Sequence, residues 1–277
     1  MATEMFAEHA ERGRRGQWRL EEMPWDEPIE FCGSTEREKT LNKLDLIDGA
    51  QAMYHFQLGA RIRMGDYISR AWSSEEALAE CLEWHDIDEQ RHLRGLRRLT
   101  VTLEAAGNDV RVINNKTDPR RMWRVSQTGP LRLDDDRLLL NLLVDEVVSK
   151  TLYEAVGRRC HLPLARALFQ SCAQDEERHV EYVLALHRSR GVSHRALETT
   201  RLQAGAVAHV ARIQGAFRPY FRAFAGITHD TTEAVATEIF RSISKVLSTL
   251  GPGWEGYPLA RLIHTADRSP WLLWILR

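Results

Sequence analysis

Apolar residues recur every three or four positions along most of the first 190 residues of the chain. Between residues 35 and 64 this pattern includes Leu41 and Ile47, and apolar side chains at this spacing share one face of an α-helix. The pattern therefore predicts a first helix, which either stops at Gly65 or continues towards Trp72.

Three further segments, over about 75–106, 134–159 and 164–190, show the same helical periodicity. Residues that interrupt helices separate them, such as Gly107 after the first of the three and Pro163 between the last two. Glycine and proline are scarce, at 17 and 9 of 277 residues, and no convincing strand pattern is present. We therefore predict an all-α protein.

The lengths of the connections predict how these helices are arranged. A short link joins the first helix to the second and the third to the fourth, while the long segment 107–135 joins the two pairs. This is the connectivity of a ferritin-like antiparallel four-helix bundle, with a long crossover between helices two and three. We predict an irregular N-terminal arm over 1–35, the bundle over 36–190, and a C-terminal extension over 191–277 whose two additional helices pack on the bundle.

Composition and charge limit the classes of protein that fit. Hydrophobic residues make up 43% and charged residues 28% of the chain, and the formal net charge is −1, so no overall field attracts nucleic acid or an anionic membrane. The N-terminus lacks the apolar run of a signal peptide, and the apolar stretch at 271–276 is too short to span a bilayer. The four cysteines form no C-x-x-C pair, which fits reduced thiols. We therefore expect a cytoplasmic protein without nucleic-acid or membrane partners.

Two nearly identical pentapeptides, DEQRH at 88–92 and DEERH at 175–179, lie on the second and fourth predicted helices. Each contains E-x-x-H, and residues three apart share a helix face. Glu89 and His92 would then form one carboxylate–imidazole pair, and Glu176 and His179 another, which together could hold two metal ions across a bundle. One E-x-x-H arises by chance in a chain of this size, but two copies with the same flanking residues favour a metal site over two solvated helix faces.

The third helix supplies a further carboxylate. Glu146 stands in an otherwise apolar run, 30 residues before Glu176, with Pro163 about midway between them. In an antiparallel pair of helices this spacing brings Glu146 and Glu176 to the same depth. Asp145 could substitute, but its side chain points about 100° away on an ideal helix.

The first helix offers a less obvious ligand. Asp48 would lie at the matching depth if this helix ends near Gly65, whereas His55 would do so if the helix runs further. Gln51 and Gln57 are neutral amides on the same helix and are weaker ligands. We place Asp48 first and His55 second.

His85 is a possible additional ligand. With Glu89 and His92 it has the spacing i, i+4, i+7, so all three share one face of the helix. Its imidazole could compensate for a missing carboxylate, or it could be a polar histidine packed near the site. Three tyrosines could also lie near the cluster, or be ordinary core residues: Tyr54, Tyr153 and Tyr182.

With these residues assembled, the segment 36–190 resembles the ferritin-like di-iron carboxylate superfamily. Its two motifs are similar to the paired motifs of soluble acyl-carrier-protein desaturases, the ribonucleotide reductase small subunit and the di-iron arylamine N-oxygenases. The resemblance implies the following metal ligands: Glu89, His92, Glu146, Glu176 and His179. It also implies a hydrogen bond from His92 to Asp175 and another from His179 to Asp88. The glutamate that the family carries on its first helix has no clear counterpart here.

The resemblance implies a centre of two Fe ions, with Mn possible at either position, and O2 as co-substrate. The expected activity is hydroxylation, desaturation or N-oxygenation of a small-molecule or carrier-bound substrate. No flavin or iron–sulfur motif is present, so we expect an external electron donor such as a ferredoxin or a reductase, and family habit suggests a homodimer. Two alternatives remain: a ferritin-like iron-binding or ferroxidase protein, and a non-catalytic helical scaffold with a decayed metal site.

Overall fold

The computed structural model describes residues 2–71, 76–106, 135–190 and 221–250. Their regular secondary structure is helical throughout, and no strand occurs among them, so the all-α prediction is confirmed. The labelled elements are α1 (Ala2–Arg15), η1 (Leu20–Glu22), α2 (Glu36–Ala71), α3 (Glu76–Ala105), α5 (Asp135–Arg159), α6 (Pro163–Arg190), α8 (Thr232–Leu247) and η3 (Ser248–Leu250).

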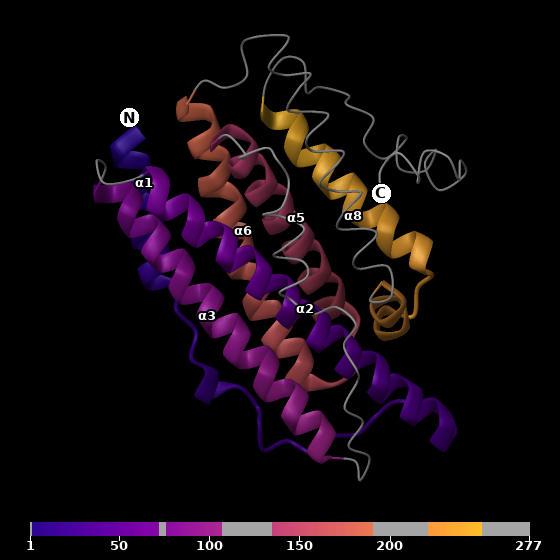
Figure 1. Ribbon diagram of the computed structural model, residues 1–277. Helices are drawn as coiled ribbons and strands as arrows, with labels where there is room; N and C mark the ends of the chain where they lie inside the picture. The colour runs from indigo at the N-terminus through magenta and orange to yellow at the C-terminus, as the bar shows by residue number, and fades with distance from the viewer. Residues whose placement is uncertain (1, 72–75, 107–134, 191–220, 251–277) are drawn as a thin grey trace.

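Helices α2, α3, α5 and α6 lie side by side as a bundle (Figure 1). Helix α5 packs along α6 and α2 packs along α3, while further contacts join α2 to α5 and α3 to α6. The predicted four-helix bundle is therefore confirmed. The predicted crossover falls almost entirely at 107–134, outside the described residues.

The core of the bundle is built from the apolar face of each helix. Completely buried side chains come from α3, α5 and α6 and include Leu96, Leu99, Leu143, Leu168 and Phe169. Burying a leucine or phenylalanine side chain stabilises the fold by about 1.5–3 kcal/mol. This packing sets the depth at which the polar residues of the two motifs sit inside the bundle.

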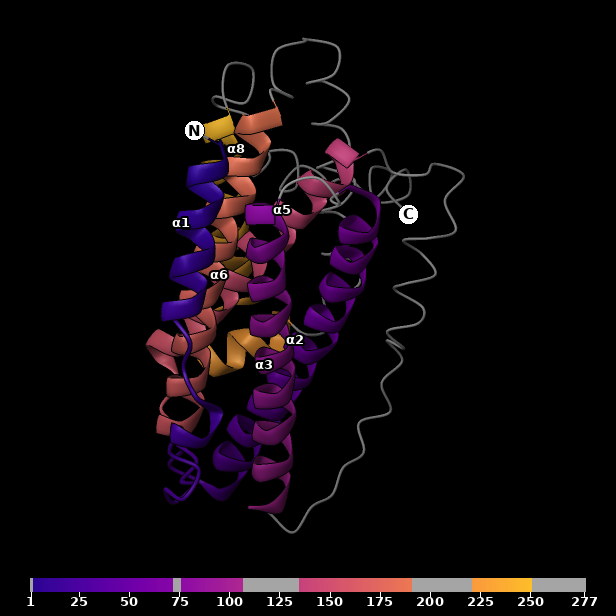
Figure 2. The ribbon, with the colours of Figure 1, turned by 90° about the vertical axis from the view of Figure 1, so that its left-hand side faces the viewer.

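The N-terminal arm is only partly irregular, contrary to the prediction. Its first part is helix α1, which packs on α3 and α6 and lies along the α6 side of the bundle in Figure 2. Phe6 and Ala10 face the core, and Gly13 lets α1 approach Trp84 so closely that a Cβ atom would come within 3.0 Å of it. Charged residues between these positions hide the helical period in the sequence.

Helix α8 belongs to the predicted C-terminal extension. Its buried residues recur at helical spacing on one face, and the helix packs on the outer side of α5 (Figure 1). One of the two predicted additional helices is therefore present. The other, and the tail of the chain, fall mainly at 191–220 and 251–277, outside the described residues.

A cap at the start of α8 gives a simple stability prediction. The Thr231 side-chain oxygen accepts a hydrogen bond from the backbone N–H of Ala234 at 3.1 Å. We expect Thr231→Ala to lower the free energy of unfolding by about 1 kcal/mol, as measured by urea denaturation. Thr231→Ser keeps the oxygen and should retain most of the stability, so an equal loss in both variants would contradict a role for the cap.

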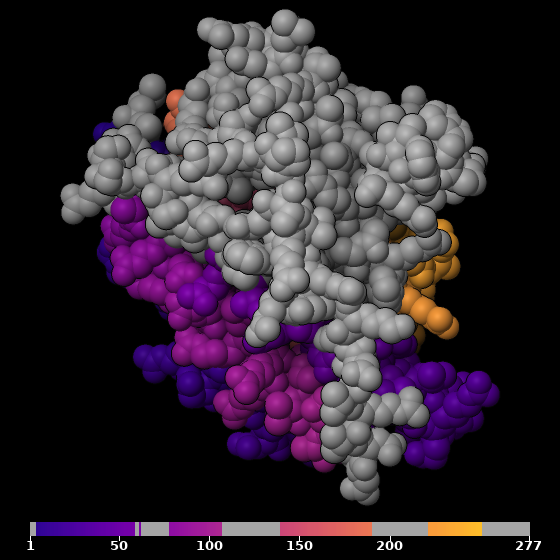
Figure 3. All heavy atoms as spheres, in the orientation of Figure 1, coloured from indigo at the N-terminus to yellow at the C-terminus, as the bar shows by residue number. Residues whose placement is uncertain are grey.

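On the face shown in Figure 3, α2 and α3 form most of the described surface, and α8 appears at one edge. Within the described parts of the chain, no helix combines the length and the apolar character needed to cross a membrane. The acidic and histidine residues of the two motifs lie beneath this surface, in the interior of the bundle.

Candidate metal centre

Residues from three helices meet in the middle of the bundle. Helix α3 contributes Glu89 and His92, α5 contributes Glu146, and α6 contributes Glu176 and His179. None of these five residues is more than 2% exposed. Burying so many ionisable groups is costly unless they are paired with one another or bind a metal, so the cluster is a candidate site.

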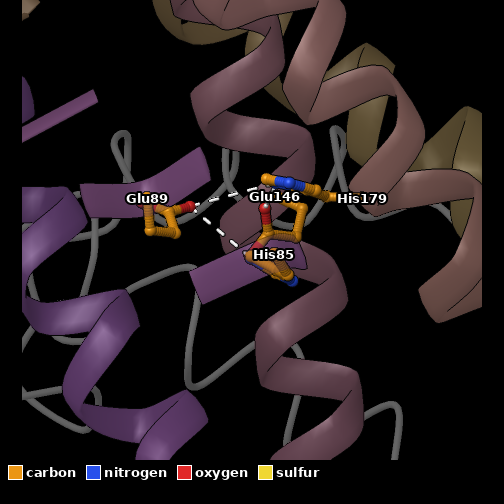
Figure 4. Close-up of side chains that lie close together, drawn as sticks. All are labelled: His85, Glu89, Glu146 and His179. Atoms are coloured by element: carbon orange, nitrogen blue, oxygen red, sulfur yellow. Dashed lines mark ion pairs between the residues drawn. The ribbon is translucent and has the colours of Figure 1, made fainter. Parts of the chain in front are cut away.

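The first part of the cluster is a four-residue group made of His85, Glu89, Glu146 and His179. Each residue offers a ligand atom, and these atoms all lie within 4.8 Å of one another. His85 Nε2 is 3.5 Å from carboxylate oxygens of both Glu89 and Glu146, and His179 Nδ1 is 3.3 Å from Glu146. Figure 4 shows the four side chains converging from α3, α5 and α6.

The second part is a three-residue group made of Glu89, His92 and Glu176, whose ligand atoms also lie within 4.8 Å of one another. His92 Nδ1 is 3.4 Å from Glu176 Oε1 and 3.8 Å from Glu89 Oε2. Glu89 belongs to both groups. The arrangement can therefore hold two cations with one carboxylate shared between them.

Unsatisfied polar atoms support this interpretation. Both carboxylate oxygens of Glu89 and of Glu146, and Nδ1 of His92, are buried without a hydrogen-bond partner among the described residues. Such atoms are rare in folded proteins unless an ion or water completes them. Carboxylate and imidazole donors suit Fe(II) and Mn(II), so the residues present fit a two-metal centre.

The groups perturb one another's ionisation. Burial, together with the charges of Glu146 and Glu89, raises the pKa of Glu176 to about 8. Burial alone would also raise the pKa of Glu146, but the neighbouring His85 and His179 hold that pKa well below its ordinary value. Without a metal, protons on Glu176 and the histidines therefore take up part of the negative charge.

This proton on Glu176 predicts a pH dependence. Since a metal ion binds the deprotonated carboxylate, the ion must displace the proton below about pH 8. We expect apparent metal affinity to rise with pH, by about tenfold per pH unit for each proton released, with the contribution of Glu176 complete above about pH 8. Calorimetric titration in two buffers with different protonation enthalpies counts the protons. Glu176→Gln should flatten the dependence, and a pH-independent affinity in the wild type would contradict the expectation.

Two aspartates orient the motif histidines from outside the metal groups. Asp175 Oδ2 lies 3.0 Å from His92 Nε2, and Asp88 Oδ2 lies 3.2 Å from His179 Nε2. These are the crossed pairs that the sequence resemblance implies. A carboxylate bonded to one ring nitrogen fixes the tautomer and leaves the other nitrogen free to bind a metal.

The arginine of each motif ties the two aspartates together. Arg91 donates to Asp88 and, at 2.8 Å, to Asp175, while Arg178 donates to Asp175 and, at 3.2 Å, to Asp88. Burial opposes ionisation of Asp175, but His92 and the two arginines hold its pKa below the ordinary value. The sequence showed the repeated arginines without revealing this role.

The N-terminal arm completes this network. Gln17 donates to Asp88 at 2.9 Å, and the Trp18 indole donates to Asp175 at 2.8 Å. The guanidinium of Arg91 lies over the Trp18 ring, 4.7 Å from its centroid. Sequence reasoning missed both arm residues, and the only signal was an aromatic residue within a charged segment.

The first bundle helix contributes differently from the prediction. Helix α2 continues to Ala71, and Asp48 belongs to neither metal group. Gln57 reaches the site instead: its amide donates to Glu176 and, at 3.1 Å, to the Tyr153 hydroxyl. Asp48 lies nine residues earlier, or about 13.5 Å along the helix axis. His55, expected if the helix ran further, is near the correct depth but is also in neither group.

His85 and two tyrosines also border the site. His85 belongs to the four-residue group, its ring stacks on that of His179 with centroids 3.7 Å apart, and its Nδ1 is hydrogen-bonded to the Tyr182 hydroxyl. Tyr153 contacts the other side of the cluster through Gln57. Both tyrosines are buried, so they are core residues that also position site residues.

Comparison with known proteins shows which solved structures share this fold. Neither the family models nor the curated proteins include a match. Among solved structures, variants of an R2-like ligand-binding oxidase with a reconstituted Mn/Fe cofactor are similar: one has a TM-score of 0.59 and 14% identity, covering 87% of this chain and 92% of the other. Another form of that oxidase, with a non-activated Mn/Mn cofactor, has a TM-score of 0.58 and 13% identity, and the match covers 87% of this chain and 91% of the other. These similarities confirm the predicted ferritin-like helical fold.

Proposed function

We propose that this protein is an O2-dependent oxidoreductase with a two-metal centre, containing two Fe ions or with Mn at one or both positions. The observation that carries the proposal is the pair of buried metal groups joined by Glu89, each with carboxylate and imidazole donors. The similar solved oxidases, which contain Mn/Fe or Mn/Mn cofactors, support this assignment.

Different sets of side chains would bind the metals and orient the metal-binding histidines. The four-residue and three-residue groups would hold one metal each, and the bound metals would supply the redox chemistry with O2. The network of Asp88, Asp175 and their two arginines would keep His92 and His179 oriented towards the metals. The apolar residues around the cluster exclude bulk water, which strengthens the interaction between these charges.

We propose hydroxylation, desaturation or N-oxygenation of a small-molecule or carrier-bound substrate as the reaction. The description of the similar structures as ligand-binding oxidases supports a small-molecule ligand. We further propose an external electron donor, a homodimer and a cytoplasmic location. All four cysteines are free thiols, which supports a cytoplasmic location because disulfides are rare in cytosolic proteins.

Anaerobic metal loading followed by exposure to O2 tests the proposal. Two metals per chain, and O2 consumption that depends on them, are the expected results. Absence of metal binding would rule the proposal out. Many irons per chain in a large assembly would instead indicate a storage protein, and bound metal that does not react with O2 would indicate a scaffold.

A further inference from the structure

Helix α2 places one neutral side chain, that of Gln57, against the cluster. Gln57 is completely buried, and its amide nitrogen donates to Glu176 and Tyr153. Its Oε1 atom is buried without a hydrogen-bond partner among the described residues. Among the described residues of helix α2, no carboxylate belongs to either metal group, and the side chain that this helix brings to Glu176 of the three-residue group is an uncharged amide.

The two groups consequently differ in their donors. Apart from the shared Glu89, the four-residue group has Glu146, His85 and His179, while the three-residue group has only His92 and Glu176. An amide oxygen attracts a divalent cation less strongly than a carboxylate does, because it carries no net charge. The second group is therefore the weaker site, and only the first has three donors of its own.

We propose that the two metal positions are filled in a fixed order, and that Gln57 is the specificity-determining residue that makes the three-residue group the second and weaker site. The inference rests on the proposed two-metal centre. A cation in the four-residue group neutralises part of the charge on Glu89, which lowers the attraction that remains for the second cation. Gln57 adds no charge to offset this loss.

Titration of the metal-free protein with Mn(II) alone, in the absence of O2, tests the order of filling. Calorimetry should resolve two binding steps of unequal affinity in the wild type. Electron paramagnetic resonance should show isolated Mn(II) after the first equivalent and coupled Mn(II) pairs after the second. A single step that fills both positions with equal affinity would overturn the proposal.

Substitution of Gln57 tests its role. Gln57→Glu supplies a carboxylate to the three-residue group and should tighten the second step by about 10- to 100-fold, the range typical of changes around metal sites, while leaving the first step unchanged. The matched control is Gln51→Glu on the same helix, because Gln51 is partly exposed and lies six residues, or about 9 Å along the helix axis, before Gln57. It should change neither step. An equal effect of Gln57→Glu on both steps, or no effect, would also overturn the proposal.

A second variant keeps the test decisive if Gln57→Glu does not fold. Glu146→Gln removes the carboxylate that only the four-residue group has, so it should weaken the first step and bring the two affinities together. Weakening of the second step alone would contradict the assignment. None of these titrations requires turnover. Failure to bind any Mn(II) or Fe(II) would count against the proposed function, whereas two equal sites would count against the order of filling only.

Discussion

Replacing Glu89 with alanine is expected to abolish stable binding of both metal ions. Glu89 is the one residue that belongs to both groups, so its loss removes a donor from each position. Loss of an outer hydrogen-bond partner at a metal site already costs about 10- to 100-fold in affinity, and loss of a shared ligand should cost more. Metal analysis after equilibrium dialysis against Fe(II) or Mn(II) measures the effect.

The same variant should still fold. Glu89 lies 3.5 Å from His85, and its charge also opposes that of Glu176. Removing Glu89 therefore removes one attraction and one repulsion, so Glu89→Ala should leave the stability of the metal-free protein close to that of the wild type. Glu83→Ala is the matched control, since Glu83 lies exposed on the same helix. Retention of two tightly bound metals by Glu89→Ala would contradict the shared position of this residue.

Replacing Asp175 with alanine is expected to cause a large loss of stability. Asp175 is completely buried and accepts hydrogen bonds from Arg91, Arg178 and Trp18 as well as from His92. Removing one member of a buried charge network leaves the remaining charges uncompensated and typically costs about 3–5 kcal/mol. Chemical denaturation of the metal-free protein should show this loss in the free energy of unfolding.

Glu177 provides the comparison for this experiment. Its side chain is 56% exposed and its contact with Lys150, at 3.2 Å, is a surface ion pair. Glu177→Ala should therefore cost no more than about 1 kcal/mol. If Asp175→Ala and Glu177→Ala lost similar amounts of stability, the buried network would not hold the arm and the two motifs together as described.

The bundle could be predicted because its signals are local. Helical periodicity and the break at Pro163 predict the bounds of α5 and α6 to within one residue. The spacing of Glu and His within each motif gives their shared face, and the 30 residues between Glu146 and Glu176 give their common depth. Each of these inferences depends only on helix geometry.

The contribution of α2 could not be predicted in the same way. Gly65 and Asp66 lie inside the helix, because a single glycine costs a helix only about 1 kcal/mol and packing along α3 offsets that cost. The depth of the site along α2 depends on where the helix ends. Placing that end near Gly65 predicted Asp48 as the site residue, whereas the longer helix brings Gln57 to the site. The contacts of Gln17 and Trp18 depend on how the arm docks, which no local pattern encodes.

The position of the arm has a consequence for the order of events during synthesis. Gln17 and Trp18 leave the ribosome before their partners Asp88 and Asp175, which follow 71 and 157 residues later. Contacts between residues so far apart along the chain form late in folding. Although the arm is made before the bundle, it can close over the motifs only after α6 has emerged, so we expect the centre to mature after translation of the bundle rather than during it.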